Sequence, residues 1–170
     1  MPYRAYRYRF YPTPDQVNNL NQTFGCVRYI YNRSLRYRQD AWYERQENVS
    51  YPQSSALLTE WKKAPERAWL NEVSSVPLQQ SLRHLQTAYR NFFQGRAKYP
   101  RFKKKDGPQS AEYTTSAFKW DGESLKLARK PAPGSPNCSG WMWRHCGGRL
   151  GRVEGGLAAT ELSEDSHTRG

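Results

Sequence analysis

The periodic pattern of this chain ends near Lys130, and that break limits what the chain can fold into. Residues 1–130 carry amphipathic stretches with spacings of two, or of three to four, residues, whereas residues 131–170 show neither spacing. Proline, glycine and small polar residues open that tail, a composition typical of segments that cannot bury enough apolar surface to fold. We therefore predict a disordered tail over 131–170 and place the folded unit in residues 1–130.

The net charge is distributed as unevenly as the pattern. The chain has a formal net charge of +12, and its tail after Lys130 holds four basic and four acidic residues, so the excess lies on residues 1–130. Such a surplus points to a polyanionic partner, with nucleic acid the first candidate and an anionic membrane surface the second. No apolar run could span a bilayer and the start has no signal-peptide core, so we predict a cytoplasmic protein without a membrane partner.

The residues that could hold a metal or drive catalysis form no recognisable site. Three cysteines cannot form a complete set of disulfides, which fits a reducing compartment. Cys138, His145 and Cys146 lack the paired Cys-x-x-Cys spacing of a zinc ribbon. We expect no metal, no cofactor and no catalytic residue. His84 is expected on a helix surface and Cys26 in the core.

The first folded segments are predicted to be a strand and a helical corner. Residues 3–11 alternate aromatic and basic side chains, which is typical of a half-buried strand. Residues 13–16, Thr-Pro-Asp-Gln, combine an N-cap, a first-turn proline and a capping-box glutamine. The helix that starts there is expected to run to about Phe24. Gly25 is expected to end it, so that a second helix follows over 26–46.

The second of these helices is predicted to have an apolar face and a basic face. Its apolar positions recur at helical spacing: Val27, Ile30, Tyr31 and Leu35. The other face carries Arg28, Asn32 and Arg33. These are candidate nucleic-acid ligands, because guanidinium groups match phosphate oxygens and asparagine can pair with an adenine edge. Taken alone, this stretch favours the simpler interpretation, an ordinary helical corner with a solvated basic face.

Two further helices are predicted. The first is short, is capped by Ser54 or Ser55 and ends at Pro65. The second is the clearest of the chain and runs from a serine cap at 74–75 to Gly95. Its apolar stripe has steps of three and four residues: Leu78, Leu82, Leu85, Tyr89, Phe92 and Phe93. Its candidates for nucleic-acid contacts are Gln79, Arg83 and Arg90.

A basic segment and a hairpin complete the folded unit. Residues 98–107 interleave Tyr99 and Phe102 with cations, so that the rings could stack on bases while the cations follow a phosphate backbone. A solvated linker is an equally good interpretation. The candidate ligands in this segment are Arg101, Lys103 and Lys104. Residues 113–128 alternate as strands do, around a turn signal at Asp121-Gly122.

Several short segments, in this order, resemble the amino-terminal part of TnpB, a family of transposon-encoded RNA-guided DNA endonucleases also known as OrfB-type transposases. They are Tyr-Arg-Phe-Tyr-Pro at 8–12, Gly-Cys-Val-Arg-Tyr-Ile-Tyr-Asn at 25–32, and the segments at 69–73, 78–82, 88–93, 100–104 and 125–127. Each segment is weak alone, but together and collinear they are specific. The resemblance covers about the first three-quarters of the chain.

The resemblance implies an α+β fold. A mainly α-helical recognition bundle with a helix-turn-helix, over 13–98, would be inserted into a partial β-barrel called the wedge. The wedge strands would lie at 1–12 and 113–130, a basic linker at 99–112 and the disordered tail at 131–170.

The resemblance also implies guide-type RNA and target DNA as partners. TnpB-like proteins contact a short motif beside the target from a loop, a recognition helix and the wedge. The matching positions in this chain are Tyr51, Ser55, Gln79, Thr114 and Thr115. Gln79 suits this role because a glutamine amide can pair with two atoms of an adenine edge. The family often has a lysine where this chain has Ser75.

The intact family would be a metal-dependent endonuclease with three carboxylates and a zinc ribbon. Nothing after Lys130 supplies these, and the acidic residues there are interpreted as solvated: Glu154, Glu161, Glu164 and Asp165. We therefore predict a nucleic-acid-binding fragment that lacks the nuclease domain and is not an enzyme on its own.

A frameshift near Lys130 would explain why charge, periodicity and resemblance stop together, and the other reading frames downstream test it. Three alternatives to the leading prediction stay open. They are a stand-alone helix-turn-helix DNA-binding protein of a mobile element, a chain that complements a separately encoded nuclease fragment, and an inactive remnant.

Overall fold

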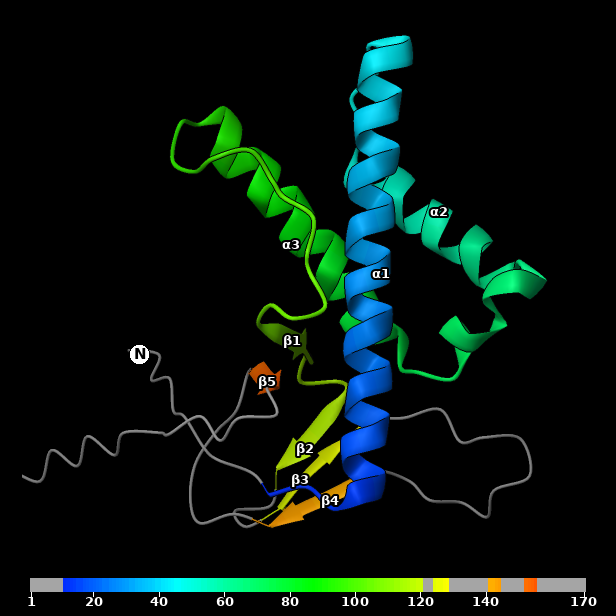
Figure 1. Ribbon diagram of the computed structural model, residues 1–170, viewed down its shortest axis with the longest axis vertical. Coiled ribbons are helices and arrows are strands. Elements are labelled where there is room, and N and C mark those ends of the chain that lie inside the picture. The colour runs from blue at the N-terminus through cyan, green and yellow to red at the C-terminus, as the bar shows by residue number, and fades with distance from the viewer. Residues whose placement is uncertain (1–10, 121–123, 129–140, 145–151, 156–170) are drawn as a thin grey trace, which may run out of the picture.

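The computed structural model describes residues 11–120, 124–128, 141–144 and 152–155. Within these residues, the elements follow in the order α1, α2, η1, α3 and β1 to β5. The shorter helices branch from the long α1, and the strands gather beside its first half (Figure 1). No helix in this part of the chain is long and apolar enough to cross a membrane.

The helix α1, Pro14–Arg45, is unbroken over 32 residues. It begins as predicted: the Thr13 backbone N–H donates to Gln16 Oε1 at 2.9 Å, one half of a capping box. The predicted helical corner at Gly25 is wrong, because the helix continues through this residue.

The reason lies in what flanks the glycine. Phe24 and Val27 are both buried, so the apolar stripe continues across Gly25. A glycine inside a helix costs only about 1 kcal/mol relative to alanine, which the burial of two large side chains outweighs. A Cβ added at Gly25 would meet no atom within 4 Å, so no close approach requires glycine here.

The helix α2, Tyr51–Lys63, begins earlier than predicted. Its N-cap is Ser50, whose backbone N–H donates to Gln53 Oε1 at 2.7 Å. The prediction that Ser54 or Ser55 caps this helix is therefore wrong, because a capping box four residues upstream already satisfies the first turn. Ser54 is buried in the first turns, and its hydroxyl donates to the Ser50 carbonyl.

A short 3-10 helix, η1 (Pro65–Asn71), links α2 to α3, Ser75–Phe93. The predicted boundaries of α3 are confirmed: Ser74 is its N-cap, and Gly95 follows it with a φ of 70°. The predicted apolar stripe, however, ends before its last member, since Phe93 is 71% exposed.

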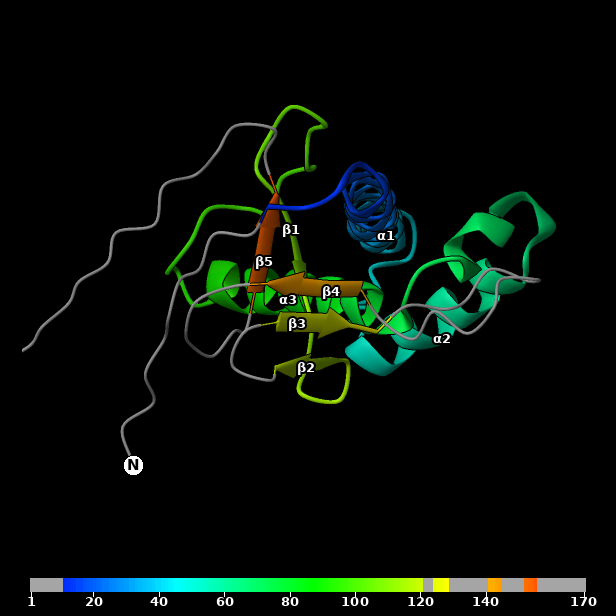
Figure 2. The same ribbon diagram turned by 90° about the horizontal axis from the view of Figure 1, so that it is seen from below.

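The strands form two small antiparallel sheets (Figure 2). They are β1 (Gln109–Glu112), β2 (Phe118–Trp120), β3 (Ser124–Leu127), β4 (Trp141–Arg144) and β5 (Arg152–Gly155). β1 pairs with β5, and β3 lies between β2 and β4. The β2–β3 pair confirms the predicted hairpin, although its turn residues Asp121 and Gly122 lie outside the described residues, as do residues 1–10 of the predicted first strand. The partial barrel stays a prediction.

Three strands lie where regular structure was not expected. β4 and β5 belong to the tail, so the prediction of disorder is wrong for these two strands; the rest of the tail lies outside the described residues. β1 lies within the segment 99–112 that was expected to be a linker. A free strand edge presents unpaired N–H and C=O groups, and a neighbouring extended segment can satisfy them. This accounts for pairing that side-chain periodicity does not signal.

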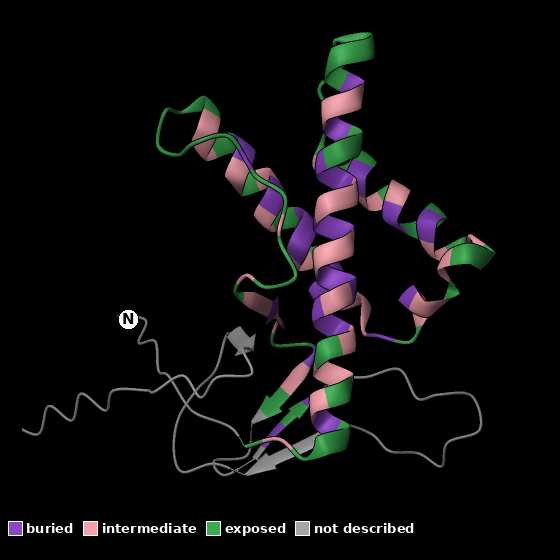
Figure 3. Ribbon diagram, in the orientation of Figure 1, coloured by how far each residue is buried: buried purple, intermediate pink, exposed green. Residues whose placement is uncertain are grey.

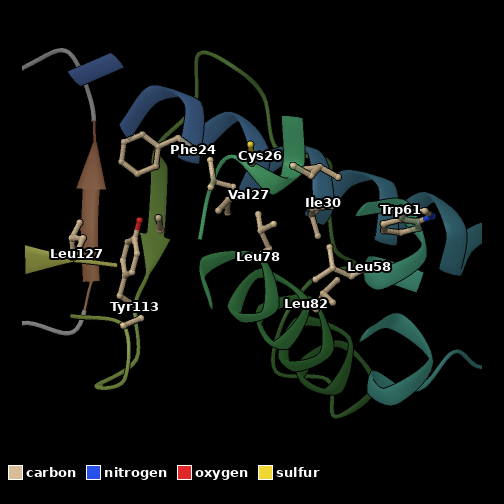
Figure 4. Packing of buried hydrophobic residues seen from close by; sticks show 14 of the residues in the cluster. Phe24, Cys26, Val27, Ile30, Leu58, Trp61, Leu78, Leu82, Tyr113 and Leu127 are labelled. Atoms are coloured by element: carbon tan, nitrogen blue, oxygen red, sulfur yellow. The ribbon is translucent and has the colours of Figure 1, made fainter. Parts of the chain in front are cut away.

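One buried cluster joins the helices to the strands (Figure 4). Its members come from α1, α2, η1 and its C-terminal flank, α3, and the segment from β1 to β3: Phe24, Cys26, Val27, Ile30, Leu58, Trp61, Leu70, Val73, Leu78, Leu82, Ala111, Tyr113, Ala117, Leu125 and Leu127. The predicted helical bundle and the hairpin therefore share a core. Burial raises the pKa of Cys26 to about 11 and that of Tyr113 to about 12.

A smaller cluster lies between α1 and α3: Tyr31, Leu35, Leu85 and Tyr89. Beyond it the two helices diverge (Figure 1). The last turns of α1 and the end of α3 are consequently exposed (Figure 3). Trp42 and Tyr43 are both exposed on this part of α1.

Candidate nucleic-acid interface

Two of the predicted α1 ligands make contacts within the protein. Arg28 Nη1 donates to Gln109 Oε1, in β1, at 3.4 Å. The Arg33 guanidinium lies 5.1 Å from the ring centroid of Trp61, in α2, which is a cation–π distance. Arg33 Nε is buried without a hydrogen-bond partner. These guanidinium groups thus tie α1 to the strand and to the second helix.

Asn32 holds the basic segment against α1. Its Nδ2 donates to the Lys103 carbonyl oxygen at 2.9 Å, and the Lys103 backbone N–H donates to its Oδ1 at 2.8 Å. Lys103 Nζ lies 4.6 Å from the ring centroid of Tyr31. Because both polar atoms of the Asn32 amide are engaged by backbone, this amide is not open to an adenine edge here.

Gln109 fixes the next part of the same segment. Its Nε2 lies within hydrogen-bond distance of three carbonyl oxygens: those of Lys104 at 2.9 Å, Lys105 at 3.0 Å and Gly107 at 2.9 Å. The Lys104 and Lys105 side chains are exposed. The segment is therefore folded onto α1 and β1 with cations facing outward, rather than being a solvated linker.

Two contacts align α2 with α3. The Arg83 guanidinium lies 5.0 Å from the ring centroid of Tyr51, at the start of α2. Lys62 Nζ, near the end of α2, donates to Ser75 Oγ at 2.6 Å. The start of α2 thus lies beside the middle of α3 and the end of α2 beside the start of α3, so the two helices run antiparallel.

This alignment brings predicted ligands from separate segments together. Ser55 is one turn after Tyr51, and Gln79 is one turn before Arg83, so both lie between the two contacts. Gln79 is exposed and Ser55 is half-buried. Tyr51 and Ser55 lie on a helix rather than on the predicted loop. We call the group Tyr51, Ser55, Gln79 and Arg83 the α2–α3 group.

Sequence reasoning missed Lys62. Its ammonium lies at Ser75, the position where the family often has a lysine. Nothing in the local spacing of α2 indicated this, because the contact depends on how the two helices are aligned.

The other predicted ligands lie elsewhere. Thr114 and Thr115 are in the turn between β1 and β2, where Thr114 Oγ1 is 2.9 Å from Ser116 Oγ. Arg90 and Arg101 are exposed, near the end of α3 and in the basic segment. These four residues are on the surface or close to it.

The residues of α3 and of the basic segment up to Lys105 carry charge of one sign. No Asp or Glu occurs between Glu72 and Asp106. The same stretch contains the following basic residues: Arg83, Arg90, Arg96, Lys98, Arg101, Lys103, Lys104 and Lys105. Such a run of cations without intervening anions produces the local positive potential that attracts phosphates.

His84 connects this surface to the strands. Its Nε2 lies 2.7 Å from Glu112 Oε2, which pairs α3 with β1, and both side chains are 37% exposed. Within the described ranges, no group of three or more His, Cys, Asp or Glu side chains is arranged to hold a metal ion.

Comparison with known families adds a match over the first part of the chain. Residues 1–47 match a family described as a helix-turn-helix domain. Of these residues, 14–45 form the single helix α1 in this structure.

Three related proteins extend the match. The chain is 60% identical over 131 residues to a Streptomyces pristinaespiralis protein named as a candidate RNA-guided DNA endonuclease, covering 76% of this chain and 33% of that protein. It is 34% identical over 124 residues to InsQ of Escherichia coli K12, named in the same way, covering 73% of this chain and 31% of InsQ. It is 37% identical over 114 residues to the virulence protein VsdF of Salmonella dublin, covering 61% of this chain and 95% of VsdF. The chain thus spans about a third of the length of the first two relatives and nearly all of the third.

Proposed function

Because the chain belongs to the TnpB family, whose longer members it matches over their amino-terminal part, we propose that it binds guide-type RNA and target DNA without cutting them. The relatives named for RNA-guided DNA cleavage are about three times as long as the matched portion. The proposal assigns to this chain the gripping and reading of nucleic acid. Its site of action would be the cytoplasm, as the sequence predicts.

The observation that supports this most is the α2–α3 group. Side chains separated by more than twenty residues in sequence are held on one surface by the Tyr51–Arg83 and Lys62–Ser75 contacts. The group and the adjoining Lys62 combine an exposed amide, two hydroxyls and two cations, which are the donors and acceptors that read base edges and bind phosphates. Three of these positions, Tyr51, Ser55 and Gln79, are also among those that the resemblance to the family singled out.

Each member can be given a role. Gln79, exposed on the first turns of α3, would pair with a base edge of a short motif beside the target. Arg83 and Lys62 would bind the flanking phosphates, with Arg83 oriented by its contact with Tyr51. Thr114 and Thr115 would contact the same nucleic acid from the wedge side.

The remaining basic residues would follow the phosphate backbone. This set comprises Arg28, Arg33, Arg90, Arg101, Lys103 and Lys104. The internal contacts of Arg28 and Arg33 use only part of each guanidinium, so N–H donors remain for phosphates.

The first experiment measures salt dependence. Binding of the full 170-residue chain to fluorescein-labelled duplex DNA and structured RNA is followed by anisotropy from low to moderate salt. The association constant should fall steeply, with a log–log slope of about −0.9 for each duplex phosphate neutralised. Arg90→Ala should weaken binding to all sequences and reduce that slope by about 1. Binding that is indifferent to salt would contradict the proposal.

The second experiment separates reading from gripping. Gln79→Ala should remove sequence preference, by roughly tenfold or more, while leaving non-specific binding intact. The neighbouring Gln80→Ala is the matched control, because this glutamine lies about a quarter of a turn round α3. Equal effects of the two substitutions would show that Gln79 has no special role.

Two alternatives are tested by the same material. A stand-alone helix-turn-helix regulator would protect a duplex site without RNA, but the unbroken α1 supplies no turn at Gly25 for such a motif. Cleavage that appears only when a separately made nuclease fragment and Mg²⁺ are added would assign this chain a nuclease partner.

The frameshift hypothesis predicts nuclease motifs in another reading frame downstream of the codon for Lys130.

A further inference from the structure

Four aromatic rings gather where α3 ends. The Tyr89 and Phe93 rings are stacked with centroids 6.2 Å apart, and Phe92 and Phe93 are 5.3 Å apart. Tyr99, in the returning chain, meets Tyr89 edge-on at 5.7 Å and Phe92 edge-on at 5.1 Å. These four residues are called the α3 aromatic cluster below. Edge-on and offset contacts of this kind fix ring orientations.

The α3 aromatic cluster packs against α1 through Tyr89. Tyr89 is buried, and the Arg38 guanidinium lies 4.3 Å from its ring centroid. Arg38 Nη1 also donates to Gln86 Oε1 at 2.8 Å. The hydroxyl oxygens of Tyr89 and Tyr99 are 3.1 Å apart, which ties the returning chain to the helix. The exposed rings therefore sit on a rigid support.

The outer rings face solvent. Phe93 is 71% exposed and Tyr99 is 40% exposed, although Tyr89, which both rings contact, is buried. Figure 1 shows the end of α3 and the turn after it projecting away from the strands and from α1. Exposed apolar surface that is held rigid and grouped, rather than scattered, commonly marks a binding site.

Charge indicates what binds there. Every charged residue from 89 to 101 is a cation, and all four are exposed: Arg90, Arg96, Lys98 and Arg101. The acid-free stretch from 73 to 105 includes the whole cluster. The other exposed aromatic residues on a helix end, Trp42 and Tyr43, instead have acidic neighbours at Asp40, Glu44 and Glu47.

We propose that the α3 aromatic cluster stacks on unpaired bases of a single-stranded nucleic acid, whose phosphates lie against the surrounding cations. This deepens the proposed function and rests on it. In a duplex the base faces are covered by neighbouring bases, so only a single strand presents a free face to Phe93 and Tyr99. Stacking is tolerant of sequence because every base has such a face.

The test uses probes that differ only in their bases. Fluorescein-labelled single strands of about 12 nucleotides, a length typical of single-strand sites, are made as oligoadenylate RNA, as oligodeoxyadenylate, and as a deoxy strand with abasic sugars over most of its length. The full chain should bind the two base-bearing strands roughly tenfold more tightly than the abasic strand. The RNA and DNA arms show which sugar is preferred.

Three variants locate the effect. Phe93→Ala and Phe93→Leu should each remove most of the preference for base-bearing strands, because leucine keeps an apolar side chain but has no aromatic face. Tyr43→Ala is the matched control, since Tyr43 is 79% exposed on the acidic end of α1 and should have no effect. Circular dichroism melts check that all three variants are folded.

The outcomes distinguish base stacking from phosphate binding alone and from a protein interface. Equal binding of base-bearing and abasic strands overturns the stacking proposal while leaving phosphate binding, and hence the proposed function, intact. Failure to bind any strand or duplex overturns both. If Phe93→Leu keeps the full preference, or if Phe93→Ala changes only sedimentation of the free chain, the cluster is a protein interface rather than a base platform.

Discussion

The polar faces of α1 and α3 have similar residues but opposite uses. On α1, Arg28, Asn32 and Arg38 bond to other parts of the chain, and Arg38 is buried. On α3, Gln79 and Arg90 point into solvent. A basic helix face can therefore either hold a fold together or offer itself to a ligand, and composition alone does not distinguish the two.

The difference follows from position in the fold. α1 is packed on one side by α3, β1 and the cluster that joins them, and on another by the basic segment, so few of its faces remain free. α3 packs against α1, α2 and β1 on its inner side, and its last turns project away from the other elements (Figure 1). Substitutions of the packed polar residues of α1 should consequently lower stability most, whereas substitutions of the solvent-facing polar residues of α3 should lower binding.

The largest effect is expected at Arg38. Arg38→Ala removes the cation–π contact with Tyr89 and the hydrogen bond to Gln86, so the free energy of unfolding should fall by about 2–3 kcal/mol. Urea denaturation measures this. Arg90→Ala, the exposed counterpart on α3, should change stability by less than about 0.5 kcal/mol. Similar losses from both substitutions would show that the packed face of α1 contributes no more to stability than the exposed face of α3.

A smaller loss is expected at Asn32. Asn32→Ala removes both hydrogen bonds to the Lys103 backbone and should cost about 1–2 kcal/mol. It should also release the basic segment, so that trypsin cleaves after residues 103–105 much faster than in the parent chain. Asn18→Ala, exposed on the same helix, is the control and should leave the cleavage rate unchanged.

The interior side of α1 should confer a pH dependence. Burial, and then the nearby Glu72, raise the pKa of Cys26 from 9.0 to about 11. The unfolded chain loses this proton first, so stability that is present in full below pH 9 should be lost as pH rises through 11, by on the order of 1 kcal/mol. In Cys26→Ala, the free energy of unfolding should fall less between pH 9 and 11 than in the parent chain. The decrease that Tyr113 causes above pH 10 should remain. An unchanged curve would show that the thiol is not the group responsible.

The smallest effect tests whether α1 is one helix. Gly25→Ala should stabilise the chain by about 0.5–1 kcal/mol, because alanine favours a helix interior and its Cβ meets no atom. Gly95→Ala is the opposite control and should destabilise it, since Gly95 has a φ of 70°. Thermal melts measure both. A loss of stability in Gly25→Ala would instead support a turn between two helices at this residue.

Local sequence patterns predicted the helices and strands well where the interactions that define them join residues close in sequence. The capping box of Thr13 and Gln16, the boundaries of α3 and the β2–β3 hairpin follow from residues within a few positions of one another. The patterns failed at Gly25 because a permissive residue allows a turn without requiring one. They failed for β4 and β5 because strand pairing depends on which edges are free.

The candidate site was predicted only as a set of residues. Sequence named Tyr51, Ser55, Gln79 and Arg83, but it could not show that they share a surface, because that depends on the alignment of α2 with α3. It also suggested that Asn32 was a base reader, when its amide holds the returning chain. Spacing fixes the direction in which a side chain leaves a helix, but not what it meets there.

By itself, the sequence determined that this chain is a basic, mostly helical protein whose positive charge lies in its first 130 residues, because charge and periodicity are properties of residue order. The tertiary structure alone decided which cations are buried and which are exposed. Where elements pack side by side, the polar groups between them form hydrogen bonds and cation–π contacts with one another, so a residue's role depends on its neighbours in space.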